Sequence, residues 1–275
     1  MITPRRPAAQ SDVAAHYDAL DAFYRDVWGE HVHHGLFERR GMPVQEAVER
    51  MTDHVAALAR IGPGSRVADV GCGYGATMRR LAPAAVTGFT LSHAQAAVAR
   101  ERDPGADVRV RDWLENDLED GSCDAVVAIE SLSHMPDKPT AFAQIARVLE
   151  PGGRLVLCDW LARSERSAWR DRLLLEPICA EGRLPSMHTP AEYAELIRGA
   201  GLVPLAFEDR SRQVSRTWSI CIARGLAKIA TDPELRRYLA SREADRIFAL
   251  TLFRILAAYG TRAMVYGIIT ATRPG

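Results

Sequence analysis

The sequence predicts a doubly wound α/β fold: a seven-stranded, mostly parallel sheet with helical lid insertions. Five short apolar runs alternate with helical stretches, namely RVADV (66–70), AVTGFT (85–90), DVRV (107–110), CDAVVAI (123–129) and RLVLCDW (154–160). This alternation is typical of parallel strands that are joined by crossover helices. Two later runs, LVPLAFED (202–209) and AMVYGIITATR (263–273), supply the sixth and seventh strands.

Composition restricts the class of protein further. The chain has 275 residues, of which 47% are hydrophobic, so it can bury a sizeable core. Lys plus Arg and Asp plus Glu both number 35, so no net charge attracts nucleic acid. The 5 cysteines have no paired spacing, which favours reduced thiols and a cytoplasmic location. No run approaches the ~18 apolar residues of a membrane span, so we expect no membrane partner.

The segments before the first strand predict a cap and then the start of the core. Ser11 precedes a capped helix that is rich in aromatic residues, so residues 1–42 are expected to form an N-terminal helical cap. Pro43 opens an amphipathic helix over residues 43–60, in which apolar side chains recur at spacings of three and four. This helix and the first five strands form the predicted core, residues 43–160.

Interruptions of the strand pattern predict two further lids. Residues 161–189 are Arg-rich and helical without a strand, which indicates an inserted lid. The remainder of the core, residues 190–275, contains a second helical lid at about 214–259. The apolar helices around 43–60 and 246–258 are candidates for pairing two copies into a homodimer.

The turn after the first strand, DVGCGYG (69–75), indicates a small-molecule site. Ligands of doubly wound sheets bind at the carboxyl ends of the strands, where the strand order reverses. Gly71, Gly73 and Gly75 are expected to let the backbone approach such a ligand. The spacing is not GxGxxG, and the second strand ends at Thr90 instead of an acidic residue, so NAD is disfavoured. No GKS or GKT follows, which excludes a P-loop.

Together with this turn, six further strings resemble the class I S-adenosylmethionine-dependent methyltransferases. They are, in order, VWGEHVHHGLF, GFTLSHAQ, RDWLEND, ESLSHMPDK, PGGRLVLCDW and MVYGIITATRP. They are similar to the tocopherol C-methyltransferase group and to bacterial enzymes that methylate natural products at sugar oxygen, nitrogen or carbon. The resemblance implies a Rossmann-like methyltransferase sheet, S-adenosyl-L-methionine as cofactor, S-adenosyl-L-homocysteine as product, and a small-molecule acceptor.

The resemblance also implies which residues meet the methionine part of the cofactor. Gly71 and Gly73 would bring the backbone against it, while Asp69 orders the turn that contains Cys72. Glu130, at the end of the fourth strand, is expected either on the cofactor side or as a group that fixes its own loop.

The adenosine part is assigned to the ends of the second and third strands. Thr90, Leu91 and Gln95 stand where other methyltransferases have an acidic ribose ligand, so Leu91 and Gln95 are expected beside ribose and adenine. Asp112 and Trp113 would hold the edge of the adenine and cover its face; the alternative for Asp112 is a carboxylate that only begins a loop.

Catalytic residues are expected in the loops after the fourth and fifth strands. His134 is the predicted general base, because imidazole titrates near neutral pH and can take a proton during methyl transfer. The alternatives are a histidine that bonds the backbone or only positions the acceptor. Asp159 is predicted to orient this imidazole or to accept the proton itself. An acceptor oxygen, nitrogen or carbon is compatible with these residues.

Histidine and aromatic residues predict contacts to the substrate. HVHHG suggests a metal, but no other Cys or His cluster supplies the three or four ligands that metal sites need, so we expect no metal. His33 and His34 are instead expected to be lid contacts. Tyr17, Trp28 and Trp160 are expected near the substrate, where aromatic faces favour a sulfonium cation.

Two other functions stay open at the level of the sequence. One is a carbocation-handling C-methyltransferase, similar to the cyclopropane synthases, which acts on a prenyl or alkene acceptor; Glu130 and the aromatic residues favour it. The other is a non-catalytic binding module that keeps the methyltransferase fold.

Overall fold

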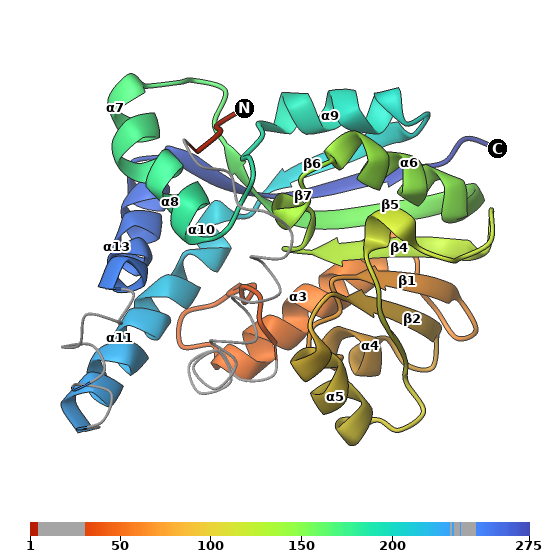
Figure 1. The fold of residues 1–275 in the computed structure, drawn as a ribbon, viewed down its shortest axis with the longest axis horizontal. Helices are drawn as coiled ribbons and strands as arrows, with labels where there is room; N and C mark the ends of the chain where they lie inside the picture. The colour runs from red at the N-terminus through yellow and green to blue at the C-terminus, as the bar shows by residue number, and fades with distance from the viewer. Residues whose placement is uncertain (5–30, 232, 234–236, 238–245) are drawn as a thin grey trace.

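A single seven-stranded sheet organises the computed structural model, which describes residues 1–4, 31–231, 233, 237 and 246–275 (Figure 1). The strand order is β3-β2-β1-β4-β5-β7-β6. The strands are β1 Arg66–Val70, β2 Ala85–Thr90, β3 Asp107–Val110, β4 Cys123–Ile129, β5 Leu149–Ala162, β6 Val203–Asp209 and β7 Met264–Thr272. The first five pair in parallel, and β7 runs antiparallel to β5 and β6. The predicted fold class is confirmed.

Alternation along the strands divides the core between the two faces of the sheet. Val67 and Val127 belong to the apolar cluster on the face of α3 (Val44–Ala59), whereas their neighbours Ala68 and Val126 belong to the cluster on the opposite face. The second face is covered by α6 (Lys138–Val148) and α9 (Pro190–Gly199). Both faces of the parallel strands are therefore buried, as their continuous apolar runs require.

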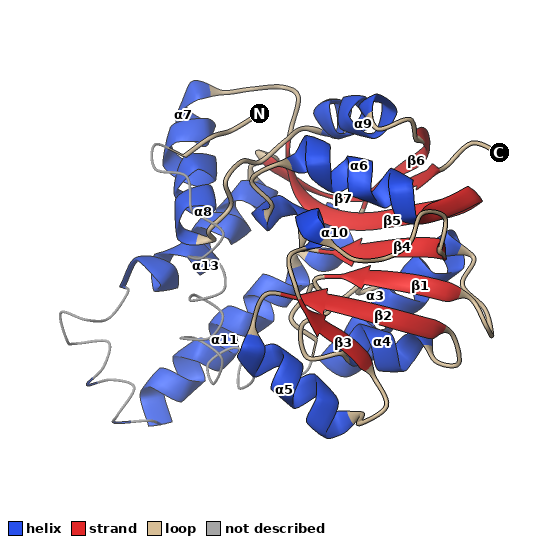
Figure 2. Ribbon diagram, turned by 45° about the vertical axis from the view of Figure 1, so that its right-hand side comes forward, coloured by secondary structure: helices blue, strands red, loops and turns tan. Residues whose placement is uncertain are grey.

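The remaining core helices cover the β1, β2 and β3 end of the sheet. They are α4 (Ala76–Leu81), which packs against α3 and β2, and α5 (His93–Arg102), which packs against β2 and β3. Arrowheads of β1, β2 and β4 point toward the side of the molecule where α11 (Arg216–Thr231) and α13 (Arg246–Gly260) lie (Figure 2). The carboxyl ends of the parallel strands thus lie beneath the lids.

The apolar stripe of α3 is used inside the subunit. Val48, Met51 and Val55 are at most 4% exposed; Met51 and Val55 belong to the core cluster shared with β4 and β5, and Val48 lies beside residues of α11. Folding already covers that stripe, so the expected pairing of two copies through residues 43–60 would have to use another face of α3 and stays a prediction. On α13 (Arg246–Gly260), Phe253 is 53% exposed, so pairing around residues 246–258 stays a prediction.

The two predicted lids are distant in sequence and pack against each other. The insertion after β5 contains α7 (Ala168–Arg170), a π-helical turn (Asp171–Leu175) and α8 (Glu176–Glu181). The later lid contains α10 (Ser211–Val214), α11 (Arg216–Thr231) and α13. Glu181 of α8 accepts hydrogen bonds from Thr251 and Arg254 of α13. These helices gather at one side of the molecule in Figure 1.

Most of the predicted N-terminal cap, including Tyr17 and Trp28, lies outside the described residues. Ile2 pairs with Met187 through an isolated antiparallel bridge. Among the helices that the structure describes, none combines the length and the apolar character needed to cross a bilayer.

The start of α9 is held by a capping box that can be tested. Thr189 Oγ1 accepts from the Glu192 amide at 3.3 Å, and Glu192 Oε2 accepts from the Thr189 amide at 2.8 Å. We expect Thr189→Ala to lower the free energy of unfolding by about 1 kcal/mol in urea titrations, because an amide of the first turn loses its acceptor. Glu195→Ala, which removes only an exposed pair with Arg198, is the control and should change little; equal losses would contradict the prediction.

Candidate functional site

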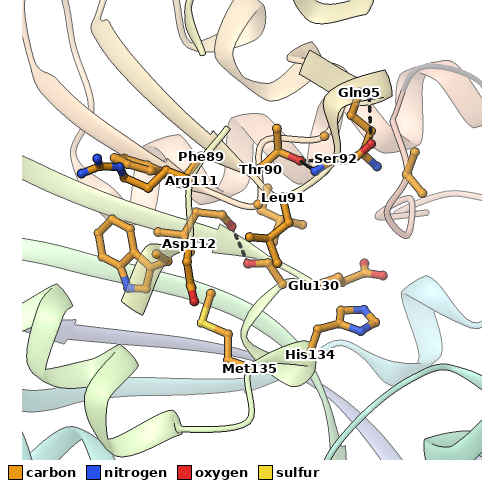
Figure 3. Close-up of a pocket in the computed structure, with 17 residues that line it drawn as sticks. Phe89, Thr90, Leu91, Ser92, Gln95, Arg111, Asp112, Glu130, His134 and Met135 are labelled. Atoms are coloured by element: carbon orange, nitrogen blue, oxygen red, sulfur yellow. Dashed lines mark hydrogen bonds between the residues drawn. The ribbon is translucent and has the colours of Figure 1, made fainter. Parts of the chain in front are cut away.

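A cavity of about 820 Å³, open to solvent, lies at the carboxyl ends of β1, β2 and β4 (Figure 3). The residues predicted from the sequence that line it are Gly71, Gly73, Thr90, Leu91, Gln95, Asp112, Trp113, Glu130 and His134. In Figure 3, Thr90, Leu91 and Gln95 lie across the cavity from His134 and Met135. The strand order reverses at β1 and β4, which is where doubly wound sheets bind ligands.

The three glycines of the first turn are required for three different reasons. A Cβ on Gly71 would lie 2.4 Å from the Cβ of Ser131, so the chain itself excludes a side chain there. A Cβ on Gly75, the N-cap of α4, would lie 3.1 Å from Ala99. Of the three, only Gly73 has open space, with no atom of the described residues within 4 Å of a Cβ built there. Ser131 thus explains why Gly71 has no side chain, while the expected approach of the Gly71 and Gly73 backbone to the cofactor stays a prediction.

Asp69 presents a buried carboxylate oxygen toward the same turn. The residue is 2% exposed, and among the described residues nothing donates a hydrogen bond to its Oδ2. Burial raises the pKa of Asp69 to about 7. Asp69, Cys72 and Gly73 line a smaller cavity of about 350 Å³ beside the main one. A buried acceptor without a donor, next to an open glycine, fits the amino-acid end of S-adenosylmethionine, whose ammonium group can donate.

The end of β2 and the start of α5 form one hydrogen-bonded unit. Thr90 Oγ1 donates to Gln95 Oε1 at 2.9 Å and accepts from the Ser92 amide at 3.2 Å. Ser92 Oγ caps α5 by accepting from the Gln95 amide at 3.0 Å. These bonds fix the orientation of the Gln95 amide and hold Leu91 between Thr90 and Ser92 at the cavity.

Asp112 and Trp113, which follow β3, each make contacts within the fold and also line the cavity. Asp112 Oδ1 accepts from the Leu114 amide at 2.9 Å and thus begins a 3-10 turn, and the residue also lines the cavity. Trp113 is 2% exposed, donates from Nε1 to the Ala141 carbonyl at 3.2 Å and packs edge-on against Phe89. One edge of this ring therefore belongs to the core while the residue reaches the cavity.

Glu130 is the acceptor of a polar network beneath the lids. Its side chain is 11% exposed and accepts from the His34 amide (2.8 Å), the Tyr266 hydroxyl (2.8 Å) and the Trp160 indole (3.3 Å). His34 Nδ1 lies 2.9 Å from its second oxygen. Burial alone would raise the pKa of Glu130, but His34, which donates from both its amide and its imidazole, outweighs burial and lowers the pKa to about 2. The backbone of Glu130 has a φ of +56°, a strained conformation that aims the carboxylate at these donors.

Hydrogen bonding settles which nitrogen of His34 carries the proton. The indole of Trp218, which can only donate, bonds to His34 Nε2. Nε2 is therefore the acceptor, and Nδ1 donates its hydrogen to Glu130. The sequence does not single out Trp218 or Tyr266, because their hydrogen-bond partners come from distant segments. Trp218 lies in the predicted lid and Tyr266 in the final strand, and these positions are the signal that the sequence offers for them.

The neighbouring histidines bond to each other and to the backbone. His31 Nδ1 lies 3.1 Å from His33 Nε2, and His33 Nδ1 lies 2.9 Å from the His34 carbonyl. Burial lowers the pKa of His31 to about 3 and also lowers the pKa of His33. Within the described part of the chain, no group of three or more His, Cys, Asp or Glu side chains is arranged to hold a metal ion.

His134 lies at the end of a 3-10 turn (Leu132–His134) and lines the main cavity. Its Nδ1 is 3.3 Å from the carbonyl of Arg183, a residue of the lid insertion with a φ of +55°. Because a carbonyl only accepts, the proton of the neutral imidazole is held at Nδ1. Nε2 then carries the lone pair, which is the form a general base needs.

Asp159 lies elsewhere than the sequence predicted. It is 0% exposed and does not line the cavity; its carboxylate accepts from the Tyr193 hydroxyl and from the Trp160 amide at 2.8 Å. Burial raises the pKa of Asp159 to about 6. The predicted roles of orienting the His134 imidazole or taking the proton are corrected, because the Arg183 carbonyl holds the imidazole and Tyr193 occupies the carboxylate.

Comparison with known proteins relates the chain as a whole to methyltransferases. The family model of mycolic acid cyclopropane synthetase matches residues 5–202. The 27-O-demethylrifamycin SV methyltransferase of Amycolatopsis mediterranei is 35% identical over 96% of this chain and 97% of its own. Tocopherol O-methyltransferase of Arabidopsis thaliana is 29% identical over 97% of this chain and 83% of its own. The solved structure of mycolic acid cyclopropane synthase CmaA1 with SAH and CTAB gives a TM-score of 0.83 at 22% identity, covering 98% and 99% of the two chains.

The two glycines that line the cavity should differ when each is replaced by alanine. Gly71→Ala should lower the free energy of unfolding by more than the roughly 1–3 kcal/mol of a strained backbone, because its Cβ also meets Ser131. Gly73→Ala should retain more stability but weaken binding of S-adenosylhomocysteine at least tenfold. Urea unfolding and titration calorimetry measure the two effects; a Gly73→Ala variant that binds normally would contradict the open-space interpretation.

The network around Glu130 should make stability depend on acidic pH. A carboxylate whose pKa is lowered by folding stabilises the protein fully above its ordinary pKa of 4.5, and this stabilisation is lost as the pH falls toward about 2. We expect the unfolding free energy of the wild type to fall over this range by about 2–3 kcal/mol more than that of Glu130→Gln. Glu38→Gln, at an exposed pair with Arg50, should retain the wild-type slope. Parallel curves for all three proteins would refute the assignment.

Proposed function

Because this chain belongs to the S-adenosylmethionine-dependent methyltransferases of the mycolic acid cyclopropane synthetase and tocopherol methyltransferase group, we propose that it methylates a small natural-product acceptor with His134 as the general base. The acceptor atom that we place first is a hydroxyl oxygen, with nitrogen and carbon as the other possibilities. The observation that carries the proposal is the cavity position of His134 together with the proton held at its Nδ1.

The residues around the cavity support a division of the site into two halves. Asp69 and Gly73 would hold the amino-acid end of the cofactor, and Leu91 and Gln95 would lie beside its ribose and adenine. Asp112 would accept from the adenine edge with the oxygen that does not begin the 3-10 turn. When bound, S-adenosylmethionine supplies a methyl group that its positively charged sulfur has already activated.

The acceptor half of the site would require little chemistry beyond positioning and proton removal. The Nε2 lone pair of His134 would accept the hydroxyl proton as the acceptor oxygen bonds to the methyl carbon; the bond from that carbon to sulfur would break at the same time and leave S-adenosylhomocysteine. The Arg183 carbonyl then stabilises the imidazolium, because it already accepts from Nδ1. The proton therefore leaves the acceptor on His134, and water later returns the imidazole to its neutral form.

The relatives support an oxygen acceptor. The names of the rifamycin and tocopherol enzymes, and of O-methyltransferase cnsE of Penicillium expansum, state O-methylation. Sarcosine/dimethylglycine N-methyltransferase of Halorhodospira halochloris, 30% identical over 73% of this chain, supports keeping an amine acceptor in the test. The curated relatives are enzymes, so the alternative of a non-catalytic module is withdrawn.

One observation favours a second candidate, a carbocation-handling C-methyltransferase for a prenyl or alkene acceptor. Four aromatic rings surround His34 beside the Glu130 carboxylate, with ring centroids 4.9–6.2 Å away: Trp160, Trp218, Tyr259 and Tyr266. Aromatic faces and a carboxylate together stabilise positive charge; of this group Glu130 lines the cavity, and the four rings pack behind it around His34. A product that gains a cyclopropane ring or a rearranged skeleton, instead of a methyl group on oxygen, would favour this candidate.

The proposal is tested by transfer of labelled methyl from S-adenosylmethionine to a panel of acceptors: 27-O-demethylrifamycin SV, trimethylhydroquinone, sarcosine and geranyl diphosphate. We expect incorporation with a mass gain of one methyl group. His134→Ala should lower kcat by about 10²–10⁴-fold and leave the affinity for S-adenosylhomocysteine within threefold.

His54→Ala is the matched control for this experiment, because His54 bonds Glu208 and does not line the cavity. It should retain wild-type turnover. Failure of the wild type to bind S-adenosylhomocysteine would overturn the proposed function, whereas full activity of His134→Ala would overturn only the assignment of the base.

A further inference from the structure

A buried lysine behind the His134 loop has no part in the chemistry described so far. Lys138, the first residue of α6, is 2% exposed. Its Nζ donates to the carbonyls of Ser133 at 3.4 Å and Met135 at 3.1 Å, the residues on either side of His134. A third bond reaches Ser186 Oγ at 3.3 Å. An ammonium group has three hydrogens, and all three have partners on the loop or on the lid insertion.

Burial of this charge is unfavourable for the fold by itself. Burial lowers the pKa of Lys138 to about 8, although Asp159 and Cys179 attract the charge. The other titratable groups that face it are His188, which precedes α9, and Tyr193, which bonds Asp159. Three hydrogen bonds and the nearby Asp159 carboxylate compensate part of this cost, and removing the lysine alone would leave these partners without it. The lysine therefore ties its partners together, and two of them belong to the loop that carries His134.

The geometry connects Lys138 to the proton on His134. The Arg183 carbonyl holds His134 Nδ1, and Ser186, three residues further along the same segment, binds Lys138. On the other side, Ser133 is bonded through its carbonyl to Lys138 and through its hydroxyl to Asp159. The ammonium thus joins the loop before α6 to the segment that orients the imidazole.

We propose that Lys138 is a positioning residue, whose ammonium group clamps the His134 loop to residues 183–186 and so keeps the imidazole proton on the Arg183 carbonyl and the Nε2 lone pair in the cavity. This inference rests on the proposed function, because Lys138 acts through the base. It does not contact the acceptor or the cofactor.

The first test observes the histidine directly. In protein saturated with S-adenosylhomocysteine and labelled with ¹⁵N-histidine, long-range NMR spectra identify the protonated nitrogen, and His134→Gln assigns the signal. We expect His134 to be the Nδ1–H form in the wild type and a mixture of both forms in Lys138→Met. Lys228→Met, which removes the other lysine of the chain, should retain the wild-type spectrum.

The second test is a double-mutant cycle on the panel acceptor with the highest turnover. Lys138→Met should lower kcat at least tenfold, with the KM for S-adenosylmethionine within threefold, at a temperature at which circular dichroism shows the variant to be folded. In the His134→Gln background the same substitution should add less than twofold, because there is no base left to position. Additive losses, or an unchanged His134 spectrum, would overturn the proposal.

Further outcomes separate this inference from the proposed function. Absence of S-adenosylhomocysteine binding by the wild type would overturn the proposed function and with it the role of Lys138. If the wild type binds S-adenosylhomocysteine but methylates no panel acceptor, the NMR comparison of His134 in the wild type and in Lys138→Met decides whether Lys138 positions the imidazole. Should Lys138→Met not fold, Ser186→Ala removes one of the three bonds and must produce a smaller shift of the His134 spectrum in the same direction; no shift refutes the clamp.

Discussion

The buried carboxylate of Glu130 is the interaction on which the arrangement of the lids depends. A carboxylate away from water must be satisfied by donors, and those of Glu130 come from His34, Trp160 and Tyr266. These residues belong to the segment before α3, to β5 and to β7. Trp218 of α11 joins through His34. One acceptor at the end of β4 therefore ties two other strands of the sheet to the segment before α3 and, through His34, to α11.

The cavity beside this carboxylate has walls of different origin. The turn after β1 and the end of β2 form one wall, with groups that bond within their own short segments, such as Thr90 and Gln95. The opposite wall is the loop from Glu130 to Met135, which is held from behind by α6, β5 and the lid insertion. Local bonding makes the first wall suited to a constant ligand. The second wall depends on lid contacts, and lids can change among relatives with different acceptors.

The sequence-based expectations succeeded or failed according to the range of the interactions behind them. The predicted bounds of β1 to β4 agree with the structure because each strand is a continuous apolar run between turn residues. The sequence could not show that Gly71 is required by the chain itself, because the side chain that excludes a Cβ there, Ser131, comes from the loop after β4. Asp159 was assigned to the cavity from its position at a strand end, but a tyrosine of α9 takes its carboxylate into the core.

The sequence by itself determined the order of strands and helices, the glycine turn and the set of polar residues at the strand ends, since periodicity, caps and motifs are properties of neighbouring residues. Only the tertiary structure decided which nitrogen of His134 and of His34 carries the proton, which of the two acidic residues Glu130 and Asp159 reaches the cavity, and where Lys138 is buried. The reason is physical: a hydrogen bond, a buried charge or an occupied space is defined by a partner, and here the partners are the Arg183 carbonyl, the Trp218 indole and the Tyr193 hydroxyl, each supplied by a segment far away in the chain.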